Sequence, residues 1–263
     1  MNNSIGFFDS GVGGTSIWKE VTVLLPKENT IYLADSRNAP YGEKSKEKII
    51  DLSIKNTEFL LNQNCKLIIV ACNTATTNAI HLLRESYNVP FIGIEPAIKP
   101  AGLITKTKKI GILATKGTLN SKLFEQTSEK IGRDVSILEQ VGDGLVELIE
   151  KGEINSPRTI DLLKKYLNPM VEENIDALVL GCTHYPYLIE EIRKIIGNKI
   201  QIIDSGLAVA KQTKNILQKL DLLQQNNPLL ATTQHVFYSN KNSSTLRSFV
   251  DHGNHIKIIE HDF

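Results

Sequence analysis

The sequence contains few cysteines. Its 263 residues include three, Cys65, Cys72 and Cys182, an odd number in a chain long enough to bury a core without covalent cross-links. A disulfide framework is therefore excluded as the organising feature, and the chain fits a reducing, cytoplasmic compartment. The presence of these thiols needs another explanation.

The sequence also lacks an excess of charge of either sign. Lys and Arg total 30, Asp and Glu total 29, and the formal net charge is +1 with no long block of one sign. Affinity for nucleic acid depends largely on a basic surface that neutralises phosphates. We therefore expect no nucleic-acid partner.

Long apolar runs are missing as well. Runs such as residues 67–71 and 177–180 are far shorter than the roughly 20 residues of a membrane-spanning helix. The first eight residues show neither the basic nor the apolar region of a signal peptide. We expect no membrane segment and no cleaved leader, and we interpret the short runs as buried strands.

The pattern that is present alternates short β-branched runs with longer segments of helical period, which is typical of α/β folds with parallel sheets. Strands are predicted at residues 5–8, 31–34, 67–71, 91–94, 110–114, 135–138, 177–180, 200–203 and 235–238. Helices are predicted over residues 45–61, 160–174 and 209–222, and over a segment in which Ile17, Val21, Leu24 and Leu25 mark one face before Pro26.

The chain resembles itself at two places. Residues 5–11 (IGFFDSG) are similar to residues 110–117 (IGILATKG), and residues 67–74 (LIIVACNT) are similar to residues 177–184 (ALVLGCTH). The spacings from first strand to cysteine, 67 and 72 residues, nearly agree (72 − 5 and 182 − 110). We predict two similar α/β domains related by a pseudo-twofold duplication, although short apolar strands also resemble each other by chance.

The crossing between the copies is predicted at residues 95–102, where Pro96 and Pro100 disfavour helix on the residues before them. The first domain would comprise residues 1–95 with 208–263, because the last segment could return to it, and the second residues 96–207. An active site is expected in the cleft between the domains, beyond the carboxyl ends of the strands.

Cys72 and Cys182 would face each other across that cleft. Two opposed thiols suit inversion at carbon, since one thiolate removes a proton and the other thiol delivers one to the opposite face. Asp9 beside Cys72 and His184 beside Cys182 are the groups available to exchange protons with them. The alternative is that each cysteine only packs in the core, as we expect for Cys65.

Three other features are less specific. The turn at residues 9–14 (DSGVGG) fits neither a dinucleotide fingerprint nor a P-loop, but its amides could bind a carboxylate or phosphate, or no ligand. The loop at residues 35–42 could close over the cleft through Tyr41 and Gly42, or be an ordinary surface loop. His252, His255 and His261 lack accompanying ligands, so a solvated tail is favoured over a metal site.

Four ordered motifs together resemble bacterial glutamate racemase, within the aspartate/glutamate racemase superfamily. They are residues 8–14 (FDSGVGG), 34–42 (ADSRNAPYG), 71–76 (ACNTAT) and 180–186 (LGCTHYP), and the likeness spans nearly the whole chain. The Cys-Asn-Thr and Gly-Cys-Thr pieces alone indicate the superfamily. The first two motifs and His184 narrow the resemblance to glutamate.

The resemblance implies an isomerase, an amino-acid racemase that interconverts L- and D-glutamate without a cofactor or metal and supplies D-glutamate for peptidoglycan. It implies that Cys72 acts on the D enantiomer with Asp9, and Cys182 on the L enantiomer with His184. Implied substrate contacts are Asp9, Ser10, Tyr41, Gly42, Asn73, Thr74, Thr115, Thr118, Glu150, Thr183 and His184. A homodimer is common in such proteins.

Two departures and three alternatives remain. Pro96-Ala97 stands where the family usually has Pro-Gly, which could alter the hinge turn, and four residues before Ile5 make an N-terminal activator-binding extension doubtful. The alternatives are a racemase of a related amino acid such as aspartate, a Cys-His thiol hydrolase using Cys182 and His184, and a non-catalytic module. Such a module would be either a two-lobed protein that binds a small molecule or an interaction protein.

Overall fold

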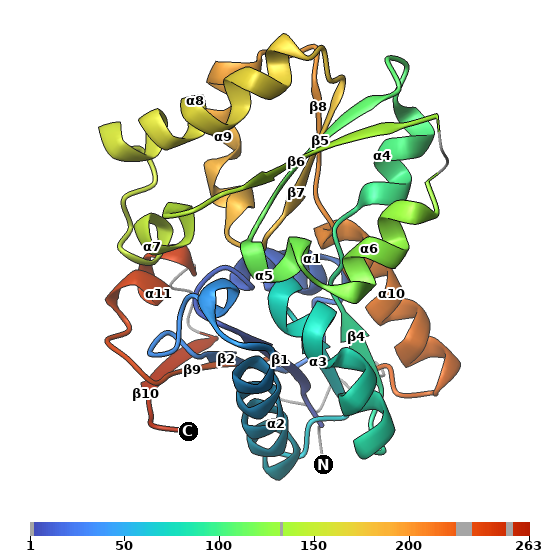
Figure 1. Cartoon of the computed structure of the whole chain (residues 1–263). Helices are drawn as coiled ribbons and strands as arrows, with labels where there is room; N and C mark the ends of the chain where they lie inside the picture. Colours follow the sequence, from blue (N-terminus) through green and yellow to red (C-terminus); the bar gives the residue numbers. More distant parts are fainter. Residues whose placement is uncertain (1–2, 132–133, 225–232, 251–254) are drawn as a thin grey trace.

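The chain folds into two lobes, each built on a parallel β-sheet, as Figure 1 shows. The structure is a computed structural model that describes residues 3–131, 134–224, 233–250 and 255–263. Both ends of the described chain lie in the lobe that contains β1.

The first sheet has the strand order β10-β9-β2-β1-β3-β4 and the second has the order β6-β5-β7-β8. The first is made of β1 (Ile5–Asp9), β2 (Thr30–Ala34), β3 (Leu67–Val70), β4 (Phe91–Gly93), β9 (His235–Ser239) and β10 (Ile256–Glu260). The second is made of β5 (Lys109–Ala114), β6 (Ser136–Val141), β7 (Ala177–Gly181) and β8 (Gln201–Ile203). The predicted α/β class with parallel sheets is confirmed.

The strand register supports the duplication. Ile5 of β1 pairs with Leu67 of β3, and Ile110 of β5 pairs with Ala177 of β7. Each cysteine stands at the same distance beyond the paired residue, since 72 − 67 and 182 − 177 both equal 5. The two thiols therefore occupy equivalent strand ends.

Helices cover both faces of each sheet. They are α1 (Thr15–Leu24), η1 (Tyr41–Glu43), α2 (Lys46–Asn62), α3 (Asn73–Ser86), α4 (Ile98–Ile104), α5 (Lys116–Leu119), α6 (Lys122–Glu129), α7 (Leu145–Glu150), α8 (Pro157–Glu172), η2 (Tyr185–Leu188), α9 (Ile189–Ile196), α10 (Gly206–Lys219) and α11 (Ser244–Phe249). Ser45, Ser121 and Ser156 accept backbone N–H groups at the starts of α2, α6 and α8.

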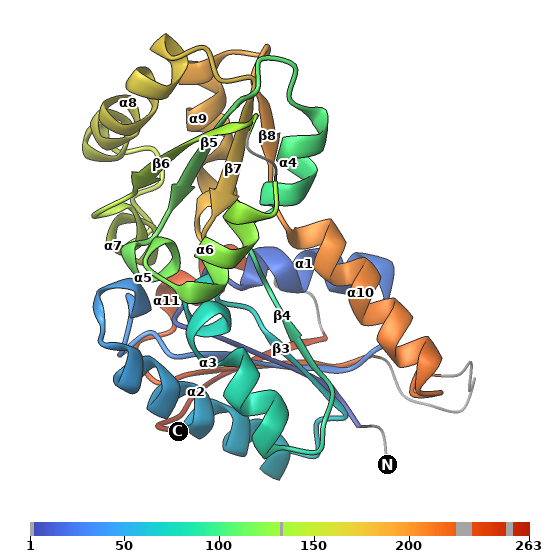
Figure 2. The same cartoon turned by 45° about the vertical axis from the view of Figure 1, so that its right-hand side comes forward.

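Alternate residues of β1 show how the layers form. Phe7 packs with residues of α1 and α10 on one face, whereas Phe8 packs with residues of α2 and α3 on the other. Side chains that alternate along a strand point to opposite faces, so a strand buried on both sides is apolar throughout. Figure 2 shows α1 and α10 side by side between the two sheets.

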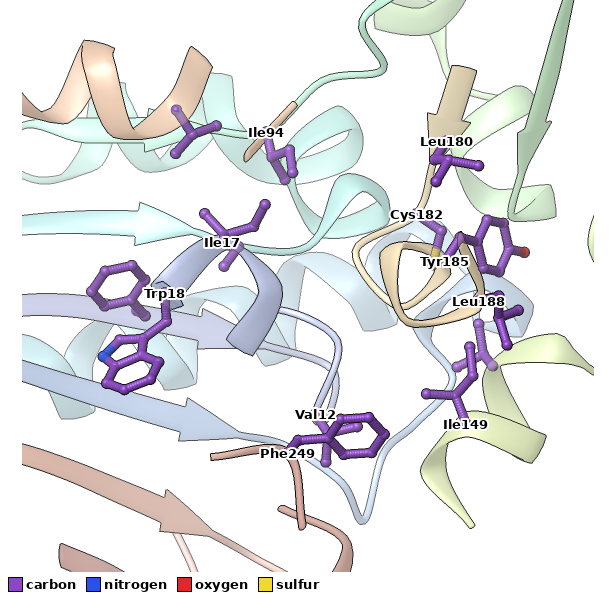
Figure 3. Packing of buried hydrophobic residues seen from close by; sticks show 14 of the residues in the cluster. Val12, Ile17, Trp18, Ile94, Ile149, Leu180, Cys182, Tyr185, Leu188 and Phe249 are labelled. Atoms are coloured by element: carbon purple, nitrogen blue, oxygen red, sulfur yellow. The ribbon is translucent and has the colours of Figure 1, made fainter. Parts of the chain in front are cut away.

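One apolar cluster joins the two lobes. Val12, Ile17 and Phe249 from the first lobe belong to the same buried cluster as Cys182 and Tyr185 from the second (Figure 3). The apolar contact is continuous from one sheet to the other, so the segments that carry the catalytic candidates are held by packing as well as by hydrogen bonds. No helix in the described part of the chain is both long enough and apolar enough to cross a membrane.

The end of the chain differs from the prediction. The strand at residues 235–238 is confirmed as β9, and the residues after it include a further strand, β10, that pairs in parallel with β9 at the sheet edge. His255 and His261 flank this strand and are exposed to solvent. His261 follows β10 and its ring contacts Phe59, while His252 lies outside the described residues. The proposed bounds of the two domains, residues 1–95 with 208–263 and residues 96–207, stay a prediction.

Candidate active site

Cys72 and Cys182 line one pocket between the lobes. It encloses about 250 Å³, including space open to solvent, and its other lining residues are Ser10, Pro40, Tyr41, Gly42, Asn73, Thr74, Thr115, Val146, Thr183 and His184. Both cysteines are nearly inaccessible to solvent. Two parallel sheets whose strand ends face each other thus bring together thiols that are 110 residues apart (182 − 72).

Cys72 is the N-cap residue of α3. Its sulfur accepts the backbone N–H of Ala75 at 3.5 Å. Burial and the nearby Asp9 carboxyl raise the pKa of the thiol well above its usual value, and Cys182 acts in the same direction. Cys72 is therefore a thiol at neutral pH until a neighbouring group takes its proton.

Asp9, at the end of β1, is fully buried beside this thiol. One carboxyl oxygen accepts the N–H of Gly14 at 2.8 Å and the other accepts the hydroxyl of Thr183 at 3.4 Å. Burial raises the pKa of Asp9 to about 6, against the lowering effect of His184. A carboxyl group that titrates so near neutrality can both release and accept a proton under ordinary conditions.

Cys182 has a different partner. Its sulfur lies 3.7 Å from Nδ1 of His184, and Nε2 of that ring lies 2.7 Å from Oε1 of Glu150. Burial lowers the pKa of His184, but the hydrogen bonds to Cys182 and Glu150 outweigh it, so the pKa is well above the usual value. At neutral pH a protonated imidazole faces the sulfur of Cys182.

Polar groups without partners lie against the same pocket. Asn73 is only 3% exposed, yet neither polar atom of its side chain has a hydrogen-bond partner among the described residues. Leaving buried polar atoms unpaired costs free energy, so a residue in this state at a pocket wall indicates a ligand that satisfies it. Asn73 also begins α3, where helix N–H groups favour an anion.

Hydroxyl groups join the lobes at the mouth of the pocket. Thr74 Oγ1 lies 2.8 Å from Thr115 Oγ1, and Thr118 Oγ1 lies 3.0 Å from that of Thr115. A Cβ added to Gly42 would lie 2.9 Å from Cβ of Thr115. The absence of a side chain at Gly42 allows this close approach of the two lobes.

The glycine-rich turn after β1 binds carboxylates of the chain itself. The N–H of Val12 donates to Oε1 of Glu150 at 2.7 Å, and that of Gly14 donates to Asp9. A Cβ at Gly11 would overlap the Glu150 carboxyl, and one at Gly13 would overlap the ring of His184. Two amides of this turn are thus paired with carboxylates of the chain itself, and binding of a ligand carboxylate or phosphate by the turn stays a prediction.

Most residues named from the sequence meet at this pocket. Asp9, Thr118 and Glu150 are brought to the site but are not among the residues that line the pocket, since each contacts a lining residue from behind. Their direct contact with a substrate stays a prediction. Pro40 and Val146 line the pocket and were not named, because an apolar helix residue such as Val146 carries no sequence signal of a site.

The chain is similar to known proteins in sequence and in fold. The sequence profile of the Asp/Glu/Hydantoin racemase family matches residues 16–213. The glutamate racemase of Ralstonia pickettii is 49% identical over 207 residues, which cover 79% of this chain and 73% of that protein. The crystal structure of glutamate racemase isoform RacE1 from Bacillus anthracis superposes with a TM-score of 0.85 at 31% identity, covering 99% of this chain and 97% of that one.

A second solved structure is equally similar. Glutamate racemase from Francisella tularensis, solved in complex with D-glutamate, superposes with a TM-score of 0.83 at 31% identity over 98% of both chains. The profile match covers well over half of the sequence, and the structural matches span nearly all of it. The chain therefore belongs to the Asp/Glu/Hydantoin racemase family.

Proposed function

We propose that this chain interconverts L- and D-glutamate by proton transfer at Cα between Cys72 and Cys182. The observation that carries the proposal is that both thiols line one pocket from equivalent strand ends of the duplicated fold. Similarity to glutamate racemases supports the choice of glutamate over aspartate.

Each inversion at Cα involves two proton transfers. One cysteine, as thiolate, takes the Cα proton of glutamate, and the electron pair of the broken C–H bond moves into the adjacent carboxylate as an enediolate. The opposite cysteine, as thiol, then gives its proton to the other face of Cα. The first sulfur ends as a thiol and the second as a thiolate, so the pair must be reset before the next turnover in the same direction.

Asp9 and His184 are the groups that reset the thiols. Asp9 beside Cys72 titrates near neutrality, and His184 contacts the sulfur of Cys182. The positive charge of His184 also favours the negative enediolate in a pocket with little access to water. The unpaired Asn73 side chain and the first N–H groups of α3 supply hydrogen bonds for a substrate carboxylate.

The test is racemisation in D₂O, started from each enantiomer. The wild-type chain should incorporate deuterium at Cα as it inverts, measured by NMR and by circular dichroism. Cys72→Ser and Cys182→Ser should each lose about 10²-fold or more of the racemisation rate, the effect of removing a positioned acid or base. Cys65→Ser is the matched control, because Cys65 lies in the core outside the pocket. Racemisation at the wild-type rate in either pocket variant would contradict the proposal, and faster turnover of aspartate would reassign the substrate.

A second candidate is a thiol hydrolase. It is favoured by one observation, the chain of contacts from Cys182 through His184 to Glu150, which matches the nucleophile, base and orienting acid of such enzymes. It leaves Cys72 in the same pocket without a role. A covalent acyl-enzyme, detected by mass spectrometry with amide or ester substrates, would support it.

The proposed reaction also sets its surroundings. Both thiols must stay reduced to exchange protons, which fits a cytoplasmic compartment. The product, D-glutamate, would serve peptidoglycan synthesis, as the family resemblance implies. A homodimer is expected on the same ground, and light scattering of the purified chain would check it.

A further inference from the structure

The loop that carries Tyr41 and Gly42 into the pocket is fastened by the last strands of the chain. Ala34, the last residue of β2, pairs with Ser239, the last residue of β9. The residues that follow them, Asp35 and Asn240, therefore leave the same sheet edge side by side. Both are buried, at 1% and 5% exposure.

Asp35 collects hydrogen bonds from the loop and from the C-terminal segment. Its Oδ2 accepts the hydroxyl of Tyr41 at 2.5 Å, and its Oδ1 accepts the side-chain amides of Asn38 at 2.8 Å and Asn240 at 2.5 Å. A buried carboxylate needs such donors, because each one replaces lost hydration. The position of Tyr41 thus depends on the group that also holds Asn240.

Asn240 uses both ends of its amide on this loop. Its nitrogen donates to Asp35, and its oxygen accepts the backbone N–H of Arg37 at 2.9 Å. An amide held at both ends has one orientation, so it fixes the start of the loop relative to β9. Asn56 of α2 also donates its side-chain amide to the Tyr41 hydroxyl at 3.1 Å.

The second lobe has no counterpart of this support in the described part of the chain. There β6, the equivalent of β2, is the outer strand of its sheet, whereas β2 is covered by β9 and β10. The family profile ends at residue 213, before β9. β9 and β10 therefore do more than extend the sheet, since the residue that follows β9 holds a pocket loop.

We propose that Asp35 and Asn240 are positioning residues that hold Tyr41 and Gly42 in the pocket wall, so that the C-terminal strands set the affinity for substrate. This rests on the proposed racemase function for the identity of the substrate. Neither residue lines the pocket, so each acts through Tyr41 and the loop backbone.

The main test is the kinetics of Asn240→Ala. We expect KM for glutamate to rise about tenfold or more, the effect of losing a hydrogen bond to a charged group, with kcat changed much less. Tyr41→Phe removes the other end of the same network, so the double variant should raise KM by less than the product of the single effects. Asp262→Ala is the matched control, because it removes an exposed ion pair between the same C-terminal segment and Arg37, and KM should not change.

A second measurement separates this proposal from the proposed function. Hydrogen exchange of the backbone amides of residues 37–39 and 41–42 should accelerate in Asn240→Ala and not in Asp262→Ala, whether or not the wild-type chain racemises glutamate. Unchanged KM in Asn240→Ala, or multiplicative effects with Tyr41→Phe, or unchanged loop exchange would overturn the positioning role. Failure of the wild type to exchange the Cα proton would instead overturn the racemase proposal.

Discussion

The two cysteines occupy matching places in a duplicated fold but have different surroundings. Cys72 caps a helix, accepts a backbone N–H and lies near the buried carboxyl of Asp9. Cys182 precedes a short η2 turn and contacts His184, which is held by Glu150. The sheet positions are shared, whereas the proton partners are not.

The duplication determines where the two thiols lie, but not which groups exchange protons with them. Parallel strands of equal register place two thiols at equivalent ends, but the side chains beyond each end belong to different loops. An inverting enzyme handles mirror-image substrates with a pocket that is not itself mirror-symmetric, so each thiol can have its own acid–base partner.

The largest effect is expected when exchange of the Cα proton with solvent is measured separately from inversion at Cα. If Cys182 acts on L-glutamate, Cys72→Ser should lose about 10²-fold or more of racemisation yet still exchange the Cα proton of the L enantiomer with D₂O. Cys182→Ser should show the reverse and retain exchange of the D enantiomer only. NMR of each enantiomer in D₂O measures this exchange. A single-cysteine variant that exchanges the Cα proton of both enantiomers equally would contradict the assignment of one enantiomer to each thiol.

The next effect concerns the contact between Gly13, in the turn after β1, and His184 of the second lobe. The backbone of Gly13 does not have a positive φ, so alanine is allowed there except for overlap with the ring of His184. Gly13→Ala should displace that ring and lower kcat about 10²-fold, as misplacement by about 1 Å can do.

Rescue distinguishes this explanation from general damage to the fold. In a His184→Ala background the obstructing ring is absent, so adding Gly13→Ala should cost little further activity. The same fractional loss in both backgrounds, or a large fall in thermal stability of Gly13→Ala alone, would show that the turn does not act through His184.

The strands and the candidate catalytic residues beside them can be predicted from local patterns in the sequence. The strands before Cys72 and Cys182 are short apolar runs with the same small and polar residues after them, and parallel register then brings the cysteines to one cleft. Asp9 is the last residue of β1, and His184 lies two residues after Cys182. Candidate catalytic residues that lie within a few residues of a strand end can therefore be predicted from the sequence.

Contacts between distant segments were not predictable in the same way. Glu150 was named only through the family resemblance, and its bond to His184 spans 34 residues. Asn240 lies 205 residues from Asp35 and belongs to no motif. β10 escaped prediction because exposed Lys257 and Glu260 interrupt its apolar pattern, as is common at a sheet edge.

The stability of the protein should depend on pH in two windows, one for each side of the pocket. Burial raises the pKa of Asp9 from 3.8 to about 6, so within this window the folded protein keeps a proton that the unfolded chain has released. The free energy of unfolding therefore falls as pH rises through it, by up to about 3 kcal/mol. The pKa of His184 is also raised, so its contribution is complete below pH 6.5 and is lost only at higher pH.

Urea unfolding across a pH series checks both windows. The wild-type minus Asp9→Asn difference should decline between pH 3.8 and about 6 and be flat above it. The difference for His184→Gln should be flat there and decline above pH 6.5. If the stability differences of both variants declined over the same pH range, Asp9 and His184 would not titrate separately. The two thiols would then not have separate proton partners.

The smallest effect is expected at Cys65, the cysteine without an equivalent in the second half. Burial raises its pKa to about 12, and its side chain packs against Gly6 and Leu60 in the core. Cys65→Ala should lower the free energy of unfolding by about 1 kcal/mol, because removing the sulfur leaves a small cavity. Racemisation should keep its wild-type rate, since Cys65 lies outside the pocket and its thiol stays protonated at neutral pH. A large loss of racemisation in a Cys65→Ala protein that is still folded would contradict this expectation. It would show that a buried cysteine of the first lobe can matter for activity without standing at a duplicated strand end.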